Sequence, residues 1–504
     1  MQLPFRFFTE GIFSALVLLL SSFIAYFIPQ SSFYIFYGLV IIFAVLSYKN
    51  LTLGALLIFA ELSLGGHGYM IRLPFVYGYI SLRHIWFFVF LIIFALKHRG
   101  ALYILWQRRT ITLDLIIGTL FVTLYGAVLG ILRGNGLKDV FFDANAFIFL
   151  LMFFPIVYIA VRDSTFLQRI TYFLLGSLTV LSFMTLLTFF IFSNAISIAP
   201  AWYLWVRDVR IGEITDIGGL YRVFFQSHIF LLIAVIVFGI LSFIKQFPLN
   251  FYSHKTVFFI FPIIFIGSLI VSMSRSFALG ITAGIATVFG IALFLGKIVL
   301  KDFPKLVIKW LFIFLCALLL VGLLSGSFFD VTHFKERLQI AGDPAVDSRW
   351  ALIKPVMEEI KNNPVFGEGF GTSVSFKTSD PRIIETTEGT GEYQTYSFEW
   401  GFFDLWLKTG FFGLIVWLVL LFSIIRSAFD LLRRGESVAE ALSAVGIVVT
   451  VAVVHFFTPY LNHPLGIGAI SLAVALTMKE ASHLLYSDDR VENPLKKGFS
   501  RPQV

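Results

Sequence analysis

The sequence has almost no cysteine and little charge. Its one cysteine, Cys316, lies in an apolar run, so the chain can form no disulfide with itself and no cysteine metal cluster. Charged residues make up 13% and hydrophobic residues 58% of the 504 residues, which leaves too little polar surface to cover several soluble domains. These shortages exclude a soluble enzyme, a disordered regulator and a secreted disulfide scaffold.

The motifs of nucleotide-dependent and metal-dependent enzymes are also missing. The nearest approach to a phosphate-binding loop runs from Gly290 to Lys297, but Ile298 follows where Ser or Thr should hold magnesium. No His-Glu-x-x-His metal motif and no Gly-x-Ser-x-Gly nucleophile elbow occurs. We therefore expect no metal and no cofactor. The net charge of +8 is what cytoplasmic Lys and Arg of a membrane protein produce, so we predict no nucleic-acid partner.

Long apolar runs fill most of the chain instead. About fourteen of them have roughly 16 to 22 residues, close to the ~20 that a helix needs to cross ~30 Å of hydrocarbon. We predict an all-α, polytopic integral membrane protein of about 12–14 transmembrane helices, with the lipid bilayer as its surroundings. The predicted spans are 11–28, 33–48, 51–66, 82–97, 111–132, 145–161, 170–193, 223–244, 256–273, 276–297, 306–325, 403–425, 438–458 and 463–478.

Lysine and arginine gather in alternate loops between these runs. Lys97 and Arg99 lie in one such loop, and the stretch 297–309 is another. The positive-inside rule makes these loops cytoplasmic. The two long connections, 194–222 and 326–402, then face outward, where nucleotide sugars and ATP are lacking.

We predict three parts in the chain. Residues 1–325 hold about 11 spans, residues 326–402 form one large extracytoplasmic loop, and residues 403–504 hold about three spans and a cytoplasmic tail. Within the loop we predict an amphipathic helix over 348–362, lying on the membrane surface. Asp347 or Ser348 caps this helix, and its apolar residues recur at helical spacing: Trp350, Ile353, Val356, Met357 and Ile360.

Outer arginines are candidate ligands for an anion, because charge at membrane depth is costly. The candidates are Arg222, Arg275, Arg210 and Arg349. Arg275 lies in a tight turn between two apolar helices, and Arg222 opens the eighth span. Two plainer interpretations stay open: Arg275 snorkels to the interface, and the loop arginines simply pair with Glu213 and Asp216.

Other ionisable residues lie close to the spans. Glu399 precedes an apolar helix and has no obvious local partner, whereas Asp404 and Lys408 in that helix are spaced to pair. His228 is more typical of a packed, hydrogen-bonded residue than of a catalyst. Glu61, in the third span, is the candidate coupling acid of a transporter, although a helix-end residue is the simpler interpretation.

Three segments together resemble the signature region of the O-antigen ligase and O-antigen polymerase superfamily. They are Asp347-Ser-Arg349-Trp350-Ala-Leu-Ile, Asn363-Pro364-Val-Phe-Gly367-Glu-Gly369-Phe-Gly371-Thr372 and Lys408-Thr-Gly410-Phe-Phe-Gly413-Leu-Ile. The turn Ser272-Met-Ser-Arg275-Ser276 is similar to the family's Ser-x-Ser-Arg turn, and Tyr221-Arg222 is similar to its other outer arginine site. The number of spans and the single large outer loop also match.

The resemblance implies a membrane glycosyltransferase with a GT-C-like, all-helical fold and no metal. Such an enzyme moves a glycan from an undecaprenyl diphosphate carrier to a glycan acceptor. It works in the inner (cytoplasmic) membrane, with its active site facing the periplasm or cell exterior. A chain-length regulator or a flippase is a further candidate partner. Outer arginines suit a diphosphate leaving group.

One position departs from the ligase pattern. The family's ligases carry a His-Asn pair eleven residues before the Gly at Gly410, and Glu399-Trp400 stands there. A carboxylate can also accept the proton of an acceptor hydroxyl, so we predict Glu399 as the general base. The change favours a polymerase that joins repeat units into O-antigen, capsular or exopolysaccharide chains. Two alternatives stay open: a ligase that transfers the glycan to lipid A core or protein, and a lipid-linked oligosaccharide flippase.

Overall fold

A computed structural model of the chain describes residues 2–75, 78–107, 110–217, 220–244, 255–297, 303–326, 344–378, 384–385, 387 and 389–478. The predicted tail after residue 478 and parts of the large outer loop lie outside these residues. The helices are α1 (Gln2–Phe27), α2 (Ser32–Lys49), α3 (Leu51–Leu64), α4 (Leu82–Lys97), α5 (Ala101–Gln107), α6 (Ile111–Leu132), α7 (Leu137–Ala144), α8 (Phe153–Arg162), α9 (Phe166–Ser193), α10 (Ala199–Asp208), α11 (His228–Ile244), α12 (Lys255–Ser272), α13 (Arg275–Phe294), α14 (Phe303–Leu324), α16 (Pro344–Asn362), α18 (Gly401–Arg434), α19 (Val438–Phe457) and α20 (Pro464–Met478).

Short 3-10 helices and three hairpins complete the described elements. The 3-10 helices are η1 (Pro29–Ser31), η2 (Asn145–Met152) and η5 (Tyr460–Asn462). The antiparallel hairpins are β1 (Arg72–Phe75) with β2 (Gly78–Ser81), β3 (Gly212–Ile217) with β4 (Leu220–Phe225), and β5 (Val374–Lys377) with β6 (Glu392–Thr395).

The predicted class, an all-α polytopic membrane protein, is confirmed. Among the described residues, nine helices are long and apolar enough to cross a membrane, and four more are apolar but shorter. The helix α4 occupies the remaining predicted span, 82–97. Each apolar run that hydropathy predicted to be a span therefore contains a helix in the structure.

The eighth predicted span begins differently from the prediction. Residues 223–225 end strand β4, where they pair with residues 212–214 of β3, and α11 begins only at His228. A short apolar run cannot be assigned to strand or helix from periodicity alone, which is why the prediction extended the helix too far. Arg222 consequently lies on a strand, opposite Thr215.

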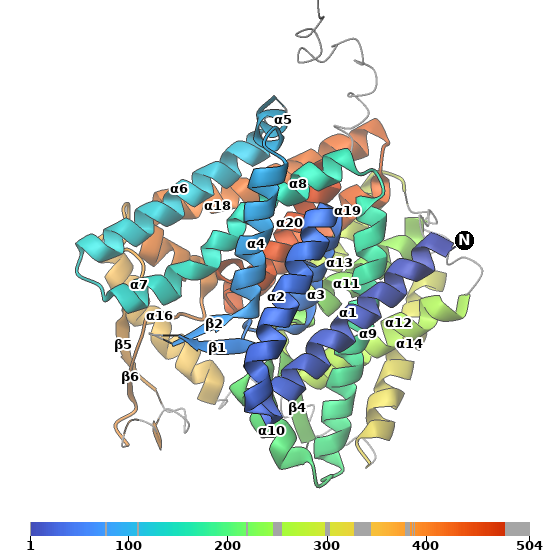
Figure 1. Cartoon of the computed structure of the whole chain (residues 1–504), viewed down its shortest axis with the longest axis horizontal. Helices are drawn as coiled ribbons and strands as arrows, with labels where there is room; N and C mark the ends of the chain where they lie inside the picture. Colours follow the sequence, from blue (N-terminus) through green and yellow to red (C-terminus); the bar gives the residue numbers. More distant parts are fainter. Residues whose placement is uncertain are drawn as a thin grey trace, which may run out of the picture.

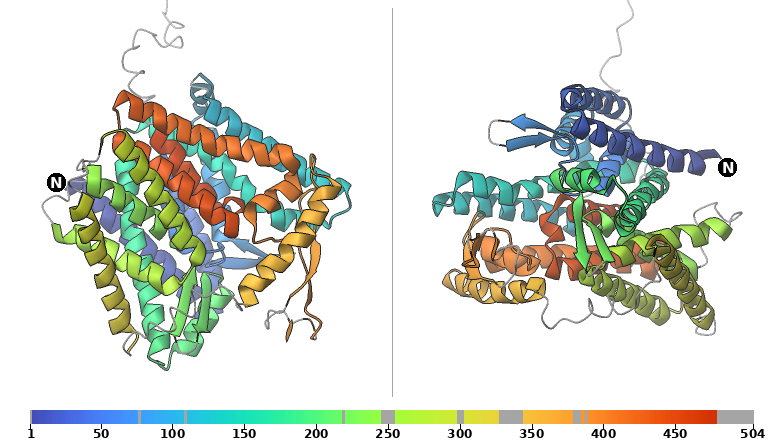
Figure 2. Two further views of the ribbon diagram at one scale, coloured as in Figure 1. Left: turned by 180° about the vertical axis from the view of Figure 1, so that it is seen from behind. Right: turned by 90° about the horizontal axis from the view of Figure 1, so that it is seen from below.

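Glycines allow the first and ninth helices to cross closely. A Cβ on Gly11 would lie 2.0 Å from the carbonyl oxygen of Phe173, and one on Gly176 would lie 2.2 Å from that of Phe8. In lipid, such close backbone contact takes the place of the hydrophobic effect between helices. Most residues of α9 and α19 are buried, whereas most residues of α2 and α14 are not. Figure 2 shows α1 and α2 along one side of the bundle, with α16 along the other.

The hairpins gather at one end of the bundle. In Figure 1 these elements extend from the left side of the molecule, where α16 and the β5–β6 hairpin lie, to the bottom, where α10 and β4 lie, whereas α5 lies at the top and the N-terminus at the right. These elements belong to connections that the positive-inside rule placed outside, and α5 belongs to one that it placed inside. The arrangement agrees with that division of the loops into two sets.

A kink in α18 fastens the large outer loop to the bundle. Gly410 has φ 70° and ψ −177°, so the helical hydrogen bonds are interrupted there. The carbonyl of Leu407 accepts the Glu368 N–H at 2.7 Å, and that of Lys408 accepts the Gly369 N–H at 3.0 Å. Two orphan helix carbonyls thus receive their partners from the loop.

The helix α6 holds the other side of the same turn. The Phe370 N–H donates to the carbonyl of Gly126 at 2.9 Å, and a Cβ on Gly130 would lie 2.2 Å from the Phe370 carbonyl oxygen. The guanidinium of Arg133 pairs with the buried Glu368 carboxylate. The run around Gly367-Glu-Gly369 is therefore a backbone clasp between α6 and α18.

The helix α16 covers a small second core in the outer loop. Leu352, Val356 and Ile360 are buried against Phe376 of β5 and Leu407 of α18. The amphipathic segment predicted over 348–362 falls within α16. Protein covers the side of the helix that carries these three residues, whereas Trp350 is exposed.

Changing the kink glycine should disrupt the clasp. A Cβ on Gly410 would lie 2.2 Å from the Val365 carbonyl oxygen, and its positive φ disfavours other residues. We expect Gly410→Ala to destabilise the folded chain by about 3 kcal/mol, measured as a lower melting temperature in detergent. Gly290→Ala is the matched control, because no atom lies within 4 Å of a Cβ there. Equal melting temperatures for both variants would contradict the clasp.

The sidedness of the two sets of loops can be tested with single cysteines. Thr390 and Arg99 are both exposed, one in the large loop and one between α4 and α5. In a chain with Cys316 replaced, we expect an impermeant thiol reagent to label Thr390→Cys in intact cells and Arg99→Cys only after lysis. The opposite pattern would invert the topology.

Candidate functional site

Two of the predicted arginine sites meet beside strand β4. The Arg222 Nε donates to the carbonyl of Ser272 at 3.0 Å, and Ser272 ends α12 just before the turn that carries Arg275. The Arg222 side chain is largely buried, with Phe224 stacked 4.9 Å below its guanidinium. Its other partner is Glu213, the pairing we had left open, at 3.6 Å. Arg275 is the first residue of α13, three residues along the chain from the Ser272 carbonyl that Arg222 binds.

Arg210 lies in a neighbouring group on the same side of the bundle. Its backbone has the left-handed φ of 51°, and its carbonyl accepts the His67 N–H at 3.1 Å. The guanidinium stands 5.4 Å from the centre of the Tyr69 ring, and Arg72 stands 5.8 Å from the same ring. Arg72 was not among the predicted residues. The sequence feature that could have identified it is a positive charge in a short outer connection.

His67 belongs to this group and is exposed. Desolvation by the surrounding protein and the positive charges of Arg210 and Arg83 lower the pKa of its imidazole. Its ring lies 5.2 Å from the His463 ring, in the turn before α20.

Glu399 and Arg349 form an ion pair, although 50 residues separate them in the sequence. About half of the Glu399 side chain is exposed, as is 38% of that of Arg349. The Trp400 indole donates to the Arg349 carbonyl at 2.8 Å and fixes the start of α18 against α16. The sequence suggested no local partner for Glu399. In the structure its partner is Arg349, which is another predicted site residue.

The end of α19 connects the Glu399 and Arg275 neighbourhoods. The Trp400 ring lies 5.8 Å from the Phe457 ring, and the next residue, Thr458, has its hydroxyl 3.4 Å from that of Ser276. Figure 2 (left) shows the β3–β4 hairpin and α16 at the same end of the bundle. The two groups therefore border one face of the protein.

A buried charge network supports the start of α18. Lys408 Nζ lies 2.5 Å from Asp404 Oδ1, the pairing that the i, i+4 spacing predicts, and also 2.5 Å from Asp143 Oδ1. The Gly371 N–H donates to the other oxygen of Asp143 at 2.8 Å, and Asn462 donates to Asp404. All three charged side chains are almost fully buried. Asp143 was not among the predicted residues. An acidic residue at the start of an apolar run is the sequence feature that could have identified it.

Two other candidates for proton transfer are occupied within the fold. Glu61 pairs with Arg83 at 2.6 Å, and both side chains are buried. His228 is fully buried, accepts the Phe225 N–H at Nδ1 and lies 2.8 Å from the Thr185 hydroxyl at Nε2. His228 is therefore the packed, hydrogen-bonded residue that we expected.

Acidic and imidazole groups do not gather into a metal centre in the part of the chain that the structure describes. No set of three or more His, Cys, Asp or Glu residues is placed there to hold a metal ion.

Comparison with known families agrees with this arrangement. Residues 259–418 match the model of the O-antigen ligase family, which confirms the predicted resemblance to the O-antigen ligase and polymerase superfamily over these residues. The match supports a glycosyltransferase-type enzyme of the ligase or polymerase kind. No curated protein matches the chain.

The structure separates two kinds of residue within the matched region. The glycines at 367, 369, 371 and 410 each have a positive φ and form the clasp and its continuation. Arg275, Arg349 and Glu399 lie outside the clasp, on the face that it stabilises. The most recognisable part of the family pattern is therefore architectural, and the ionisable residues beside it are the candidates for chemistry.

Proposed function

We propose that this protein is a glycosyltransferase on the outer face of the inner membrane. It polymerises oligosaccharide repeat units carried on undecaprenyl diphosphate into O-antigen, capsular or exopolysaccharide chains. Arg222 and Arg275 bind the diphosphate, with Arg210 on the same side, and Glu399 is the general base.

The hydrogen bond from Arg222 to Ser272 carries this proposal. It joins a strand of one outer connection to the turn before Arg275, which supports a single ligand shared by these two positions from distant parts of the chain. A diphosphate carries several negative oxygens, and arginine binds such groups through two N–H donors at once. The match to the O-antigen ligase family covers Arg275 and Glu399 and supports the same reaction class.

The proposed reaction needs one proton acceptor and one stabilised leaving group. Glu399 accepts the proton of an acceptor hydroxyl, whose oxygen forms a bond to the anomeric carbon of the donor glycan. The bond from that carbon to the carrier phosphate breaks, and the carrier diphosphate leaves with the electron pair. Arg222 and Arg275 stabilise the negative charge that develops on it.

Arg349 is proposed to position the base. Its guanidinium pairs with Glu399, and its carbonyl is bound by the neighbouring Trp400. An orientation that is set before the acceptor arrives reduces the entropy that the reaction must lose. To bind diphosphate itself, as we predicted, Arg349 would have to leave this carboxylate.

Two observations separate the proposal from its alternatives. A carboxylate at position 399, where the family's ligases have histidine, favours polymerisation over ligation. The buried pairing of Glu61 with Arg83 gives that carboxylate a structural partner, which favours the transferase over a flippase that would use Glu61 as its coupling acid.

Reconstitution with purified lipid-linked repeat units tests the function directly. We expect the protein in liposomes to convert them into a ladder of longer carrier-linked chains without nucleotide or added metal. Transfer of a single glycan to lipid A core, with no ladder, would identify a ligase instead. Movement of the lipid-linked glycan between leaflets without any new glycosidic bond would identify a flippase.

A further inference from the structure

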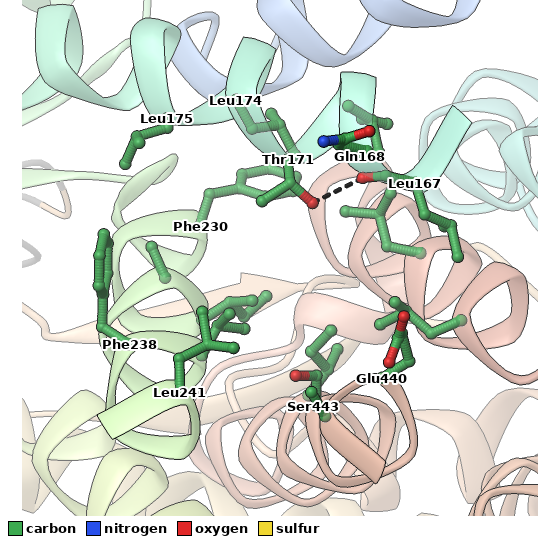
Figure 3. A pocket seen from close by; sticks show the side chains of 18 of the residues that line it. Leu167, Gln168, Thr171, Leu174, Leu175, Phe230, Phe238, Leu241, Glu440 and Ser443 are labelled. Carbon is green, nitrogen blue, oxygen red and sulfur yellow. Dashed lines mark hydrogen bonds between the residues drawn. The ribbon is translucent and has the colours of Figure 1, made fainter. Parts of the chain in front are cut away.

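Two features away from the candidate site are not used by the proposed function. One is a cavity of about 300 Å³ between α9, α11, α19 and α20, lined at the first turns of α9 and α19 (Figure 3). Its lining is mainly apolar, and Glu440 is the one charged residue among the described residues that line it. This cavity therefore offers no positive charge to an anion. The other feature is a group of basic side chains where α4 and α8 end.

Lys97, His98 and Arg162 form this group, the α4–α8 cluster. Lys97 ends α4, His98 follows it, and Arg162 ends α8. The Lys97 ammonium donates to the carbonyl of Tyr48 and lies 4.6 Å from the centre of the Tyr48 ring. The His98 Nδ1 lies 3.2 Å from the Tyr158 hydroxyl, and Arg162 donates to the same hydroxyl at 2.9 Å. One tyrosine hydroxyl thus joins the ends of the two helices.

The positive charges of the α4–α8 cluster have no carboxylate partner in the part of the chain that the structure describes. Lys97 donates to a neutral carbonyl and Arg162 to a neutral hydroxyl. Asp163, the residue after Arg162, pairs instead with Arg169 at 3.2 Å. Desolvation, followed by the charges of Lys97 and Arg162, lowers the pKa of His98, so both charges act at one place. An anion would complement this place.

Exposed apolar side chains lead along two helices to the α4–α8 cluster. They are Phe88, Ile92 and Leu96 on α4, and Ile41, Val45 and Tyr48 on α2. Residues three or four apart share one face of a helix, so each set forms a stripe. The helices α2 and α4 pack together, and both stripes end where Lys97 contacts Tyr48. In a bilayer such stripes contact acyl chains, and a tyrosine at their end suits the level of the head groups.

We propose that the α4–α8 cluster binds an anionic phospholipid, with its phosphate at Lys97 and Arg162 and its acyl chains along the stripes of α2 and α4. A phosphate oxygen is a stronger acceptor for a cation than a neutral carbonyl or hydroxyl. Basic groups between transmembrane helices on the cytoplasmic side suit such head groups, and the positive-inside rule makes this end cytoplasmic. The site is therefore independent of glycan transfer on the outer face.

Native mass spectrometry of the purified full chain tests this site. Phosphatidylglycerol, which carries one negative charge, and phosphatidylcholine, which has no net charge, are offered in equal amounts with identical acyl chains. We expect the wild-type protein to retain phosphatidylglycerol at least about tenfold more, a free-energy difference of about 1.4 kcal/mol. Lys97→Gln together with Arg162→Gln should lower the retained phosphatidylglycerol by about tenfold, and Arg162→Gln alone by about fivefold.

A matched variant removes the same total charge from other helices. Arg6→Gln with Arg433→Gln changes two exposed arginines outside the cluster, of which Arg6 pairs with Glu10, and should keep full retention. Equal melting temperatures show that the variants are folded. Equal retention of the two lipids by the wild type, or unchanged retention in the folded double variant of the cluster, would overturn the proposal. An equal loss in the matched variant would do the same, because it would show an effect of net charge alone.

A water-soluble head group separates a lipid site from a simple phosphate site. Glycerophosphoglycerol is the head of phosphatidylglycerol without its acyl chains, so it can use the cations but not the stripes of α2 and α4. We expect the wild-type protein not to retain it under the same conditions. Retention equal to that of the lipid would contradict the assignment of a phospholipid.

Discussion

Replacing Arg222 or Arg275 by alanine is expected to lower the rate of glycan transfer by about 10³-fold or more, the loss typical of an arginine that stabilises a departing phosphate group. Both residues lie beside the turn after Ser272, so each variant removes charge from the same place. The measurement is chain elongation by the reconstituted protein at equal amounts of folded enzyme. Lysine should restore little activity at either position, because it cannot bind two phosphate oxygens in parallel.

Arg207→Ala is the control for this experiment. Arg207 is an arginine of the same outer connection, more than half exposed, and it pairs with its neighbour Asp208 at 2.8 Å. Its hydrogen bond, with that of Tyr26, lowers the pKa of Asp208, so its charge is already engaged. We expect nearly unchanged transfer. Wild-type transfer by Arg275→Ala would show instead that Arg275 only snorkels at the membrane surface.

Glu399→Gln is expected to lower turnover by about 10²- to 10⁴-fold, the range typical of a general base. The substitution keeps the shape of the side chain and a hydrogen bond to Arg349 while removing the group that accepts the proton. Binding of the carrier-linked donor should persist because the arginines remain. Comparing turnover with donor binding in the same reconstituted assay separates these effects.

Two further variants test the assignment of the base. Glu399→His should recover part of the activity, since an imidazole can accept the same proton from nearly the same place. Glu392→Gln, an exposed acid of the same loop, should retain the wild-type rate. Full activity of Glu399→Gln together with loss in Glu392→Gln would move the base to Glu392.

Pairings at the site could be anticipated from the sequence only between residues close in the chain, as for Arg222 with Glu213 and for Asp404 with Lys408. Asp404 and Lys408 are four residues apart on one helix, so helical geometry alone brings them together. Arg349 and Glu399 lie 50 residues apart, and no periodicity relates them. Arg222 and Ser272 are likewise separated by 50 residues and belong to different elements. Arg222, Arg349 and Glu399 were candidates because a charge at a membrane costs free energy, but their partners far along the chain could not be predicted from the sequence.

The sequence by itself determined that this protein is a bundle of apolar helices in a membrane. Hydropathy is a property of each segment, and a backbone in lipid must satisfy its own hydrogen bonds, so a long apolar run has essentially one solution. Family motifs likewise marked the stretch from Arg275 to Gly413 before any contact was known.

Only the tertiary structure decided which charges meet. Asp143 of α7 joins Lys408 because Gly371, next to the clasp, binds the Asp143 carboxylate beside α18, and Glu61 meets Arg83 because α3 and α4 pack together. Those contacts depend on how the helices cross. The crossing is determined by small residues that let the backbones of two segments, far apart in the chain, approach each other closely. A buried charge is stable in lipid only with its partner, so the fold, not the local sequence, determined which charged residues pair inside the bundle.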